Sequence, residues 1–289
     1  MDRLVSIVLP VYNGEEFLRE SIDSVINQSY LNWELIIIDD CSTDQTQIIA
    51  KEYESNDDRI HYFRNEVNLR LPKTLNRGFS FAKGELLTWT SDDNLFHSDA
   101  IEKMVACMTS NNVDFVYASC AIIDKDNNII DYIIVDENSE KKLKGMDSIG
   151  ACFMYSREVY KSVGDYNPAL ELVEDIDYWQ RTIARFNSGY INEILYDYRF
   201  HDNALTSTMK KEVFYTNIIQ MISSNRKIYN KTDYLDNYYI LKALVFCEKN
   251  LNSIKLSDWV SFQKYRLIVF LKKNSKQKIS SLLFYLFKR

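Results

Sequence analysis

The chain has 289 residues, 46% hydrophobic and 26% charged, so it can bury a core and is not a disordered polypeptide. A net charge of −6 argues against a nucleic-acid partner, which usually calls for a basic surface. No apolar run approaches the roughly 20 residues of a membrane span. Five widely spaced cysteines and the lack of a signal-peptide pattern predict a cytoplasmic protein with reduced thiols.

The first half of the chain alternates short apolar runs with helical periodicity. The predicted strands are Leu4–Pro10, Leu35–Asp39, Glu85–Thr90 and Val113–Ala118. The predicted helices are 17–26, 44–54, 72–83 and 98–110. Such alternation is typical of βαβ units, so we expect an α/β fold of Rossmann type, with a mostly parallel sheet flanked by helices.

The pattern changes after about residue 120. Ile122–Asp124 and Ile129–Val135 predict a hairpin, and the polar stretch 136–148 predicts a mobile loop. A helix is predicted at Asp175–Phe186 and a strand at Tyr190–Phe200. We therefore expect a catalytic α/β domain over 1–210, with halves of about 1–120 and 121–210, followed by a helical C-terminal region over 211–289.

Carboxylates cluster where predicted strands end or a helix begins. They occur as pairs at 39–40, 92–93 and 174–175. In an open parallel sheet, ligands bind outside the carboxyl ends of the strands. Two adjacent carboxylates after an apolar strand repel each other, and a divalent cation removes that repulsion. Mg²⁺ and Mn²⁺ are commonly held by one or two carboxylates together with substrate phosphates. The pair at 92–93 thus predicts a clamp for a metal-bound diphosphate.

Each acidic group also has a simpler interpretation. Asp92 would cap the following helix while Asp93 is solvated. Asp40 either accepts a hydrogen bond from a nucleobase N–H or caps a turn. Asp44 is expected in the first turn of a helix, where a negative charge is favourable. Glu174 and its acidic neighbours would be no more than the acidic N-terminal end of a helix.

Arg199 and His201 lie in the segment RFHDN, after the last predicted strand. A loop with both residues would close over a diphosphate, with His201 as a metal ligand and Arg199 as a bidentate phosphate clamp. The alternative is a solvated surface loop.

Five segments occur in an order that resembles the family 2 glycosyltransferases, which have the GT-A fold. They are VSIVLPVYNGEEFL, IIIDDCSTDQT, NRGFSFAKGELLTWTSDDN, LVEDIDYWQR and YRFHDNALT. Together they extend from Val5 to Thr206, about two-thirds of the chain. Each segment is a weak signal by itself, and their combination is specific.

The resemblance implies roles for the N-terminal segments. It places the nucleobase against Pro10, Tyr12 and Asp40. It makes Asp93 the principal metal ligand, with Asp92 near the ribose or the metal. Thr90 stands where the family often has a further aspartate, which leaves the contacts of position 90 undefined. The residues expected near the diphosphate are Arg70, Lys73 and Asn76.

The C-terminal segments match the family in the same way. Asp175 matches the general base of an ED motif, and Glu174 beside it would position the acceptor. Arg199 and His201 match a mobile RxH segment found in part of the family. The resemblance therefore implies an inverting transfer that depends on Mn²⁺ or Mg²⁺, from a nucleotide-sugar, with UDP as the expected nucleotide, to a glycan or lipid-linked glycan hydroxyl. It also points to the bacterial enzymes that build surface polysaccharides such as capsule or O-antigen.

Two other classes of protein remain open at this point. One is a metal-dependent phosphodiesterase that uses the same scattered carboxylates, and the acidic net charge counts against it. The other is a glycan-binding or assembly subunit that has the fold without the chemistry, and the presence of both the SDD and the ED segments counts against that.

The segment 261–289 differs from the rest of the chain in charge. It carries +8, which leaves −14 on residues 1–260, and it interleaves Leu, Ile, Phe and Tyr with Lys and Arg. This pattern resembles an interfacial amphipathic helix that would bind the anionic inner face of the cytoplasmic membrane. The alternative is a helix that packs on the body with a solvated basic face.

Overall fold

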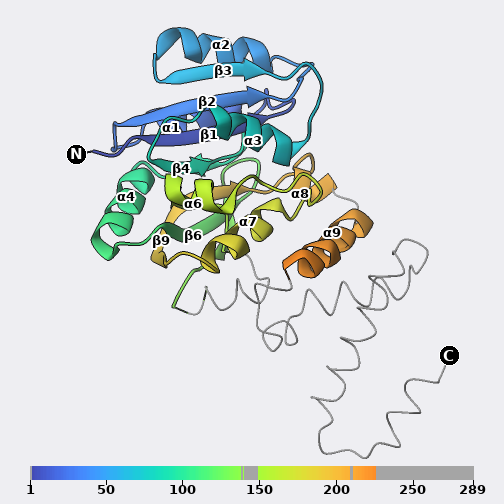
Figure 1. The fold of residues 1–289 in the computed structure, drawn as a ribbon. Coiled ribbons are helices and arrows are strands. Elements are labelled where there is room, and N and C mark those ends of the chain that lie inside the picture. The colour runs from blue at the N-terminus through green and yellow to red at the C-terminus, as the bar shows by residue number, and fades with distance from the viewer. Residues whose placement is uncertain (1, 138, 140–148, 209–210, 226–289) are drawn as a thin grey trace, which may run out of the picture.

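The computed structural model describes residues 2–137, 139, 149–208 and 211–225 (Figure 1). Its strands are β1 (Val5–Val11), β2 (Trp33–Asp39), β3 (Ile60–Arg64), β4 (Leu86–Trp89), β5 (Leu95–Phe96), β6 (Phe115–Ile123), β7 (Ile129–Ile133), β8 (Phe153–Ser156) and β9 (Ser188–Arg199). Its helices are α1 (Leu18–Ile26), α2 (Thr46–Asn56), α3 (Leu71–Phe81), α4 (Ala100–Asn111), α6 (Arg157–Val163), α7 (Glu174–Ile183), α8 (Leu205–Thr208) and α9 (Lys211–Ser224).

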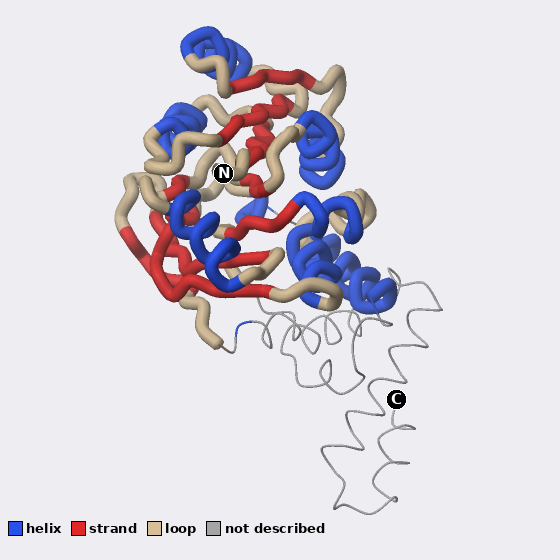
Figure 2. The backbone as a smooth tube through the Cα atoms, turned by 60° about the vertical axis from the view of Figure 1, so that its left-hand side comes forward, coloured by secondary structure: helices blue, strands red, loops and turns tan. Residues whose placement is uncertain are grey.

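The described strands form one nine-stranded sheet in the order β3-β2-β1-β4-β8-β6-β9-β5, with β7 paired to β6. β1 pairs in parallel with β2 and β4, β2 with β3, and β6 with β9. β8 runs antiparallel to both β4 and β6 and joins these two parallel parts. Helices cover both faces of the sheet (Figure 2). The predicted α/β fold is confirmed.

Alternate side chains of the central strands enter two separate hydrophobic clusters. All seven residues of β1 are buried, and so are all seven of β2. Ile7 and Leu9 pack with the apolar side of α1, whereas Val8 packs with Leu75 and Phe79 of α3. Side chains of a strand point alternately to opposite faces, so a strand buried on both faces is apolar throughout.

The predicted elements of the first half are confirmed with shifts of one or two residues at most boundaries. The predicted hairpin is confirmed, since β6 pairs antiparallel with β7. Its first strand is not separate, however, because β6 continues without a break from Phe115 to Ile123. The prediction also lacks β3, β5, β8 and α6. β3, with the sequence IHYFR, mixes apolar residues with His and Arg, and β5 has only two residues, so neither shows the continuous apolar run that marks a buried strand.

The sheet is completed by a segment with no regular hydrophobic period. β8 is four residues long and directly precedes α6, whose N-cap Ser156 accepts a hydrogen bond from the N–H of Val159. All four residues of β8 are buried between the two parallel parts of the sheet. A strand this short gains its stability from its two neighbours, which a local sequence pattern does not reveal.

Only part of the predicted C-terminal region is described. α9 packs Ile218 and Met221 against Leu170 and Val173, which precede α7. Most of the predicted loop 136–148 and the whole segment 261–289 lie outside the described residues. Within the described part of the chain, no helix has both the length and the apolarity required to cross a membrane.

Candidate active site

The carboxyl ends of β1, β2 and β4 lie side by side, and a cavity of about 560 Å³ is present there. Residues of the helices α7, α8 and α9 line it as well. Most of the predicted site residues line this cavity, namely Pro10, Tyr12, Asp40, Arg70, Asp92, Asp93, Glu174, Asp175 and His201. Lys73, Asn76 and Arg199 are not among its lining residues.

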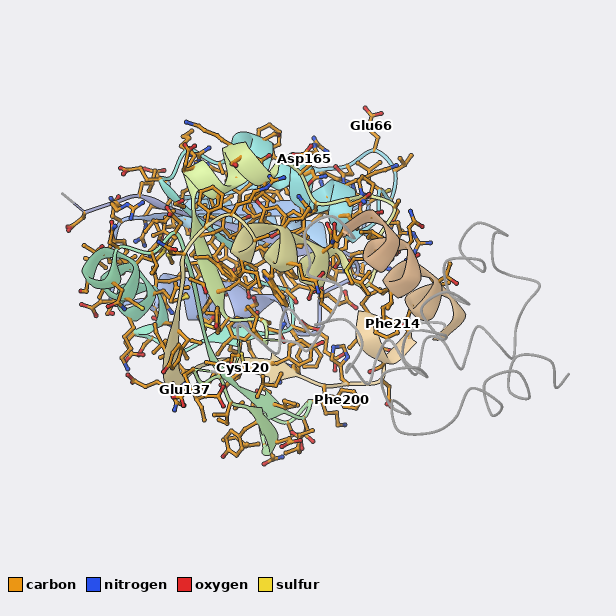
Figure 3. All side chains as sticks on the ribbon, turned by 60° about the horizontal axis from the view of Figure 1, so that its bottom comes forward. Glu66, Cys120, Glu137, Asp165, Phe200 and Phe214 are labelled. Atoms are coloured by element: carbon orange, nitrogen blue, oxygen red, sulfur yellow. The ribbon has the colours of Figure 1, made fainter. Side chains whose placement is uncertain are left out.

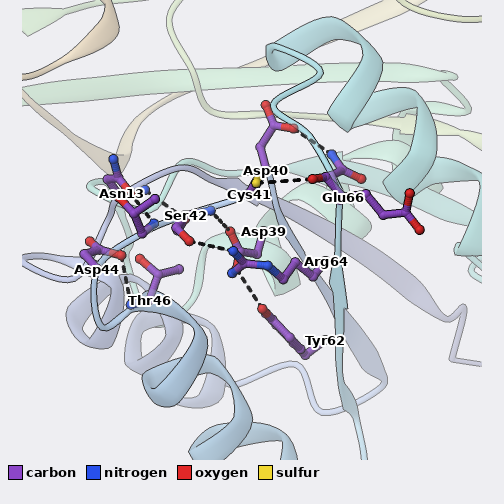
Figure 4. Close-up of polar contacts among 12 residues, drawn as sticks. Asn13, Asp39, Asp40, Cys41, Ser42, Asp44, Thr46, Tyr62, Arg64 and Glu66 are labelled. Carbon is purple, nitrogen blue, oxygen red and sulfur yellow. Dashed lines mark hydrogen bonds and ion pairs between the residues drawn. The ribbon is translucent and has the colours of Figure 1, made fainter.

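The loops that follow β1 and β2 are bound to each other by reciprocal hydrogen bonds (Figure 4). The N–H of Asn13 donates to Ser42 Oγ at 2.9 Å, and the N–H of Thr43 donates to Asn13 Oδ1 at 2.8 Å. The N–H of Glu15 donates to Asp44 Oδ2 at 3.0 Å. Asp44 therefore joins the two loops and lies just before α2, not within its first turn. The paired loops hold Tyr12, which is 51% exposed, at the cavity.

The two aspartates at the end of β2 have different surroundings. Asp39 is fully buried, and its Oδ2 accepts from Tyr62 Oη and Arg64 Nη1, both at 2.7 Å (Figure 4). Asp40 lines the cavity. Its carboxylate accepts from Asn65 Nδ2 at 2.7 Å and from the main-chain N–H groups of residues 69 and 70 at 2.7 and 2.9 Å. A carboxylate has about four acceptor positions, so one remains for a ligand.

The three residues expected near a diphosphate are placed differently. Arg70 adopts a φ of 69°, a left-handed conformation that is unfavourable for a bulky residue. Its side chain is 70% exposed and lies 3.9 Å from Glu171. Lys73 is exposed to solvent and is not among the residues that line the cavity. The amide of Asn76 donates to the carbonyl of Tyr166 and accepts from its N–H, both at 2.8 Å, so it is used within the fold.

The Asp92–Asp93 pair follows β4 and faces the cavity with His201. Asp93 Oδ2 lies 3.1 Å from His201 Nε2. Asp93 Oδ1 is buried and has no hydrogen-bond partner in the described part of the chain. Burial and the negative charge of Asp93 raise the pKa of Asp92 well above its usual range. A side chain at position 14 would overlap this pair, because a Cβ on Gly14 would lie 2.0 Å from Asp92 Oδ2.

These groups fit a divalent cation whose ligands come partly from the protein and partly from a bound substrate. Among the described residues, no three His, Cys, Asp or Glu side chains are grouped closely enough to form a metal site by themselves. Mg²⁺ and Mn²⁺ bound with substrate phosphates need only one or two protein carboxylates. Asp93, with its unpartnered oxygen, and the adjacent imidazole of His201 meet that requirement. A cation would also offset the repulsion between Asp92 and Asp93.

The Glu174–Asp175 pair begins α7 and lines the same cavity. Burial raises the pKa of Asp175 to about 6, and burial together with the charge of Asp175 raises the pKa of Glu174 to about 8. Burial therefore disfavours the ionisation of both carboxyl groups at once. Glu174 Oε2 has no hydrogen-bond partner in the described part of the chain. Asp177 is instead used in the fold, where it binds Arg181 and Asn225, both at 2.8 Å.

Arg199 does not occupy the position expected of a phosphate clamp. Its side chain is completely buried, and its guanidinium donates to the carbonyl of Asp93 at 2.8 Å and to Glu20 Oε2 at 2.9 Å. It also donates to Asn127 Oδ1 at 2.7 Å. The structure therefore separates the two residues of the RFHDN segment, since His201 lines the cavity and Arg199 lies beneath it.

Several cavity residues had no predicted role. Gly14 follows an Asn, and an Asn-Gly pair is a turn signal that marks such a position. Leu172, two residues before the start of α7, has a φ of 75°, and nothing in its local sequence indicates this strain. Trp89 and Trp179 also line the cavity, but in sequence they resemble ordinary core residues. Phe17 contacts the His201 ring at 5.1 Å between centroids.

The fold and the site have counterparts among known proteins. The family model "Glycosyl transferase family 2" matches residues 6–164. The chain is 28% identical to the UDP-Glc:alpha-D-GlcNAc-diphosphoundecaprenol beta-1,3-glucosyltransferase WfgD of Escherichia coli, over 73% of this chain and 83% of WfgD.

Two solved structures share the fold at low sequence identity. TarS 1–349 of S. aureus, in complex with UDP-GlcNAc, is 16% identical with a TM-score of 0.66, over 92% of this chain and 80% of that one. The mannosyltransferase PcManGT of Pyrobaculum calidifontis, in complex with GDP-Man and Mn²⁺, is 13% identical with a TM-score of 0.64, over 96% of this chain and 89% of that one.

The protein is therefore an α/β protein of the GT-A type, with an acidic cavity at the carboxyl edge of its sheet. The family model covers more than half of the chain, and the chain belongs to the family 2 glycosyltransferases.

We predict that Gly14→Ala lowers the free energy of unfolding by about 1–3 kcal/mol, because the new methyl group overlaps the Asp92 carboxylate and Val11. In an Asp92→Ala background the same substitution costs less, because the nearest overlapping atoms are gone. Urea titration of the wild type, both single variants and the double variant measures this coupling. Strictly additive losses would show that Asp92 does not pack against Gly14.

Proposed function

We propose that the protein is an inverting glycosyltransferase that requires a divalent metal. It moves a sugar from a nucleotide-sugar, with UDP as the nucleotide, to a hydroxyl of a glycan or lipid-linked oligosaccharide. The reaction belongs to the biosynthesis of a surface polysaccharide such as capsule or O-antigen. Residues 1–120 bind the donor, and residues 121–210 supply the acceptor side of the site.

One observation carries this proposal. The Asp93–His201 pair and the Glu174–Asp175 pair come from segments far apart in the sequence and line one cavity. A sugar transfer needs both a group that neutralises a departing diphosphate and a base that faces the acceptor. Both kinds of group are available in this one cavity.

Asp175 is proposed as the general base. The acceptor hydroxyl attacks the anomeric carbon from the face opposite the diphosphate, and its proton passes to the Asp175 carboxylate. A new carbon–oxygen bond forms as the bond from the anomeric carbon to the diphosphate oxygen breaks, so the configuration inverts in a single displacement. Burial raises the pKa of Asp175 to about 6, which makes its carboxylate a stronger base than an ordinary aspartate. Glu174 positions the acceptor.

The donor side is proposed to hold the nucleotide and the metal. Pro10 and Tyr12 lie against the nucleobase, and Asp40 accepts a hydrogen bond from it. Asp93 and His201 hold Mn²⁺ or Mg²⁺, with Asp92 near the ribose or the metal. The cation, when bound, stabilises negative charge on the leaving diphosphate. Arg70, exposed at the cavity, adds positive charge on the same side.

The comparisons support the choice of substrates. WfgD takes UDP-glucose and an acceptor linked to undecaprenyl diphosphate, as its name states. TarS is known in complex with UDP-GlcNAc, and PcManGT in complex with GDP-Man and Mn²⁺. A hexosyl or N-acetylhexosaminyl donor and a metal requirement are therefore proposed for this chain.

We expect the wild-type protein to release UDP from a UDP-sugar in the presence of Mn²⁺, and to lose this activity in EDTA. A panel of UDP-, GDP- and dTDP-sugars, followed by nucleotide release, tests this. Nucleotide binding without turnover of any donor in the panel would instead favour a non-catalytic glycan-binding subunit. Cleavage of bis(p-nitrophenyl) phosphate, with no donor turned over, would favour a phosphodiesterase.

Asp175→Asn is expected to lower transfer by about 10²–10⁴-fold, because it removes the base, while donor affinity remains. In the wild type, the rate should rise with pH through about 6, since only the ionised Asp175 accepts a proton. The matched variant Glu174→Gln keeps the size and hydrogen-bonding groups needed to position the acceptor, and it should retain both activity and the rise in rate with pH. Rate–pH profiles of the three proteins measure the difference. An active Asp175→Asn enzyme, or an inactive Glu174→Gln enzyme with normal donor affinity, would assign the base elsewhere.

The segment 261–289 is proposed to attach the protein to the inner face of the cytoplasmic membrane. Its charge of +8 is interleaved with apolar residues. Each basic residue near an anionic surface contributes about 1 kcal/mol. A lipid-linked acceptor is embedded in the same membrane, so such attachment would bring the enzyme to its substrate.

Deletion of 261–289 should reduce binding to vesicles that contain anionic lipid and should leave UDP-sugar hydrolysis unchanged. Vesicle co-sedimentation of the full chain and the deletion variant measures the effect, and neutral vesicles provide the control. Equal binding of both proteins to anionic vesicles would show that this segment is not the attachment.

A further inference from the structure

Arg199 is the buried centre of a network beneath the Asp93–His201 pair. Its Nε donates to the Asp93 carbonyl at 2.8 Å, and its own N–H donates to Asn94 Oδ1 at 2.7 Å. Both the side chain and the main chain of Arg199 thus hold the segment that carries Asp93. This segment follows β4, whereas Arg199 ends β9.

The rest of the guanidinium binds two further segments. Nη2 forms an ion pair with Glu20 of α1 at 2.9 Å. Nη1 donates to Asn127 Oδ1 at 2.7 Å and to the carbonyl of Lys125 at 3.2 Å, in the turn between β6 and β7. The β6–β7 hairpin lies at the surface beside the end of β9, where Phe200 is labelled in Figure 3. Arg199 therefore joins four parts of the chain at one point.

Phe17 links this network to the metal-binding candidates. The guanidinium carbon of Arg199 lies 4.5 Å from the centroid of the Phe17 ring, and the His201 ring lies 5.1 Å from the same ring. His201 is two residues after Arg199 and reaches Asp93 Oδ2. The position of each member of the Asp93–His201 pair thus depends on contacts of Arg199.

We propose that Arg199 is a positioning residue for the metal site and does not contact the diphosphate. The proposal rests on the function proposed above, in which Asp93 and His201 hold the cation. Replacing a residue that orients a metal ligand, without binding the metal itself, typically lowers metal affinity by 10–100-fold. The guanidinium suits this role, because its planar fork binds several carbonyl and carboxylate oxygens at fixed angles.

The test compares Arg199→Lys with Arg157→Lys. Lysine keeps the positive charge but has a single donor group in place of the fork. Arg157 is the matched control, because its guanidinium also binds main-chain carbonyls, those of Gly84 and Ala82, and it is not among the residues that line the cavity. Calorimetric titration of full-length protein with Mn²⁺ in the presence of UDP, and with UDP alone in EDTA, gives the two affinities. Thermal melts report stability.

We expect Arg199→Lys to weaken Mn²⁺ binding at least tenfold, with UDP affinity in EDTA unchanged, and Arg157→Lys to lower the melting temperature only. A second variant, Glu20→Gln, removes the charge of the half-exposed partner of Arg199. It should weaken Mn²⁺ binding to a smaller extent. Unchanged Mn²⁺ affinity in Arg199→Lys would limit this residue to a role in stability. A large loss of UDP affinity in EDTA would make it a phosphate ligand, and either result overturns the proposal.

Failure of the proposed function itself gives a different result. A wild-type protein that binds neither Mn²⁺ nor UDP would remove the metal-dependent transferase, and the positioning role with it. A wild-type protein that binds both, beside an Arg199→Lys variant with the same Mn²⁺ affinity, would remove the positioning role alone.

Discussion

Repulsion between carboxylates gathered at one edge of a sheet is the constraint on which this site depends. Parallel strands bring their carboxyl ends together, so acids that follow β2 and β4 come to face one cavity, and α7 adds two more. Burial without neutralisation raises the pKa values of Asp92, Glu174 and Asp175. In the proposed function, a divalent cation and the exposed Arg70 supply the positive charge that offsets these carboxylates.

Other acidic residues of the same region are paired with arginines inside the protein. Asp39 and Arg64 neutralise each other, and Asp177 is paired with Arg181. These residues lie next to the proposed ligands in sequence, yet their charges are already satisfied within the protein. The contrast separates residues that hold the loops in place from Asp93 and Glu174, each of which retains a buried oxygen without a partner in the described part of the chain.

Two residues that line the same cavity have left-handed backbone conformations. Arg70 and Leu172 both line it with positive φ values, although neither residue type favours them. Such strain persists only where the surrounding structure imposes it. At Arg70 that surrounding includes Asp40, which binds its main-chain N–H, so one carboxylate takes part in both the cavity lining and the turn into α3.

The sequence by itself determined the α/β class, the main strands and the order of the acidic segments, because apolar runs and strand-end carboxylates are local patterns. β8 and β3 were not predicted, since four or five residues are too few to show a hydrophobic period, and strands this short depend on pairing with their neighbours. Tertiary structure alone decided which predicted site residues face the cavity. Asn76 and Arg199 carry suitable side chains, but the first is bound to the Tyr166 main chain and the second is buried among four segments. Whether a polar group is available to a ligand depends on what the rest of the fold has already bonded to it.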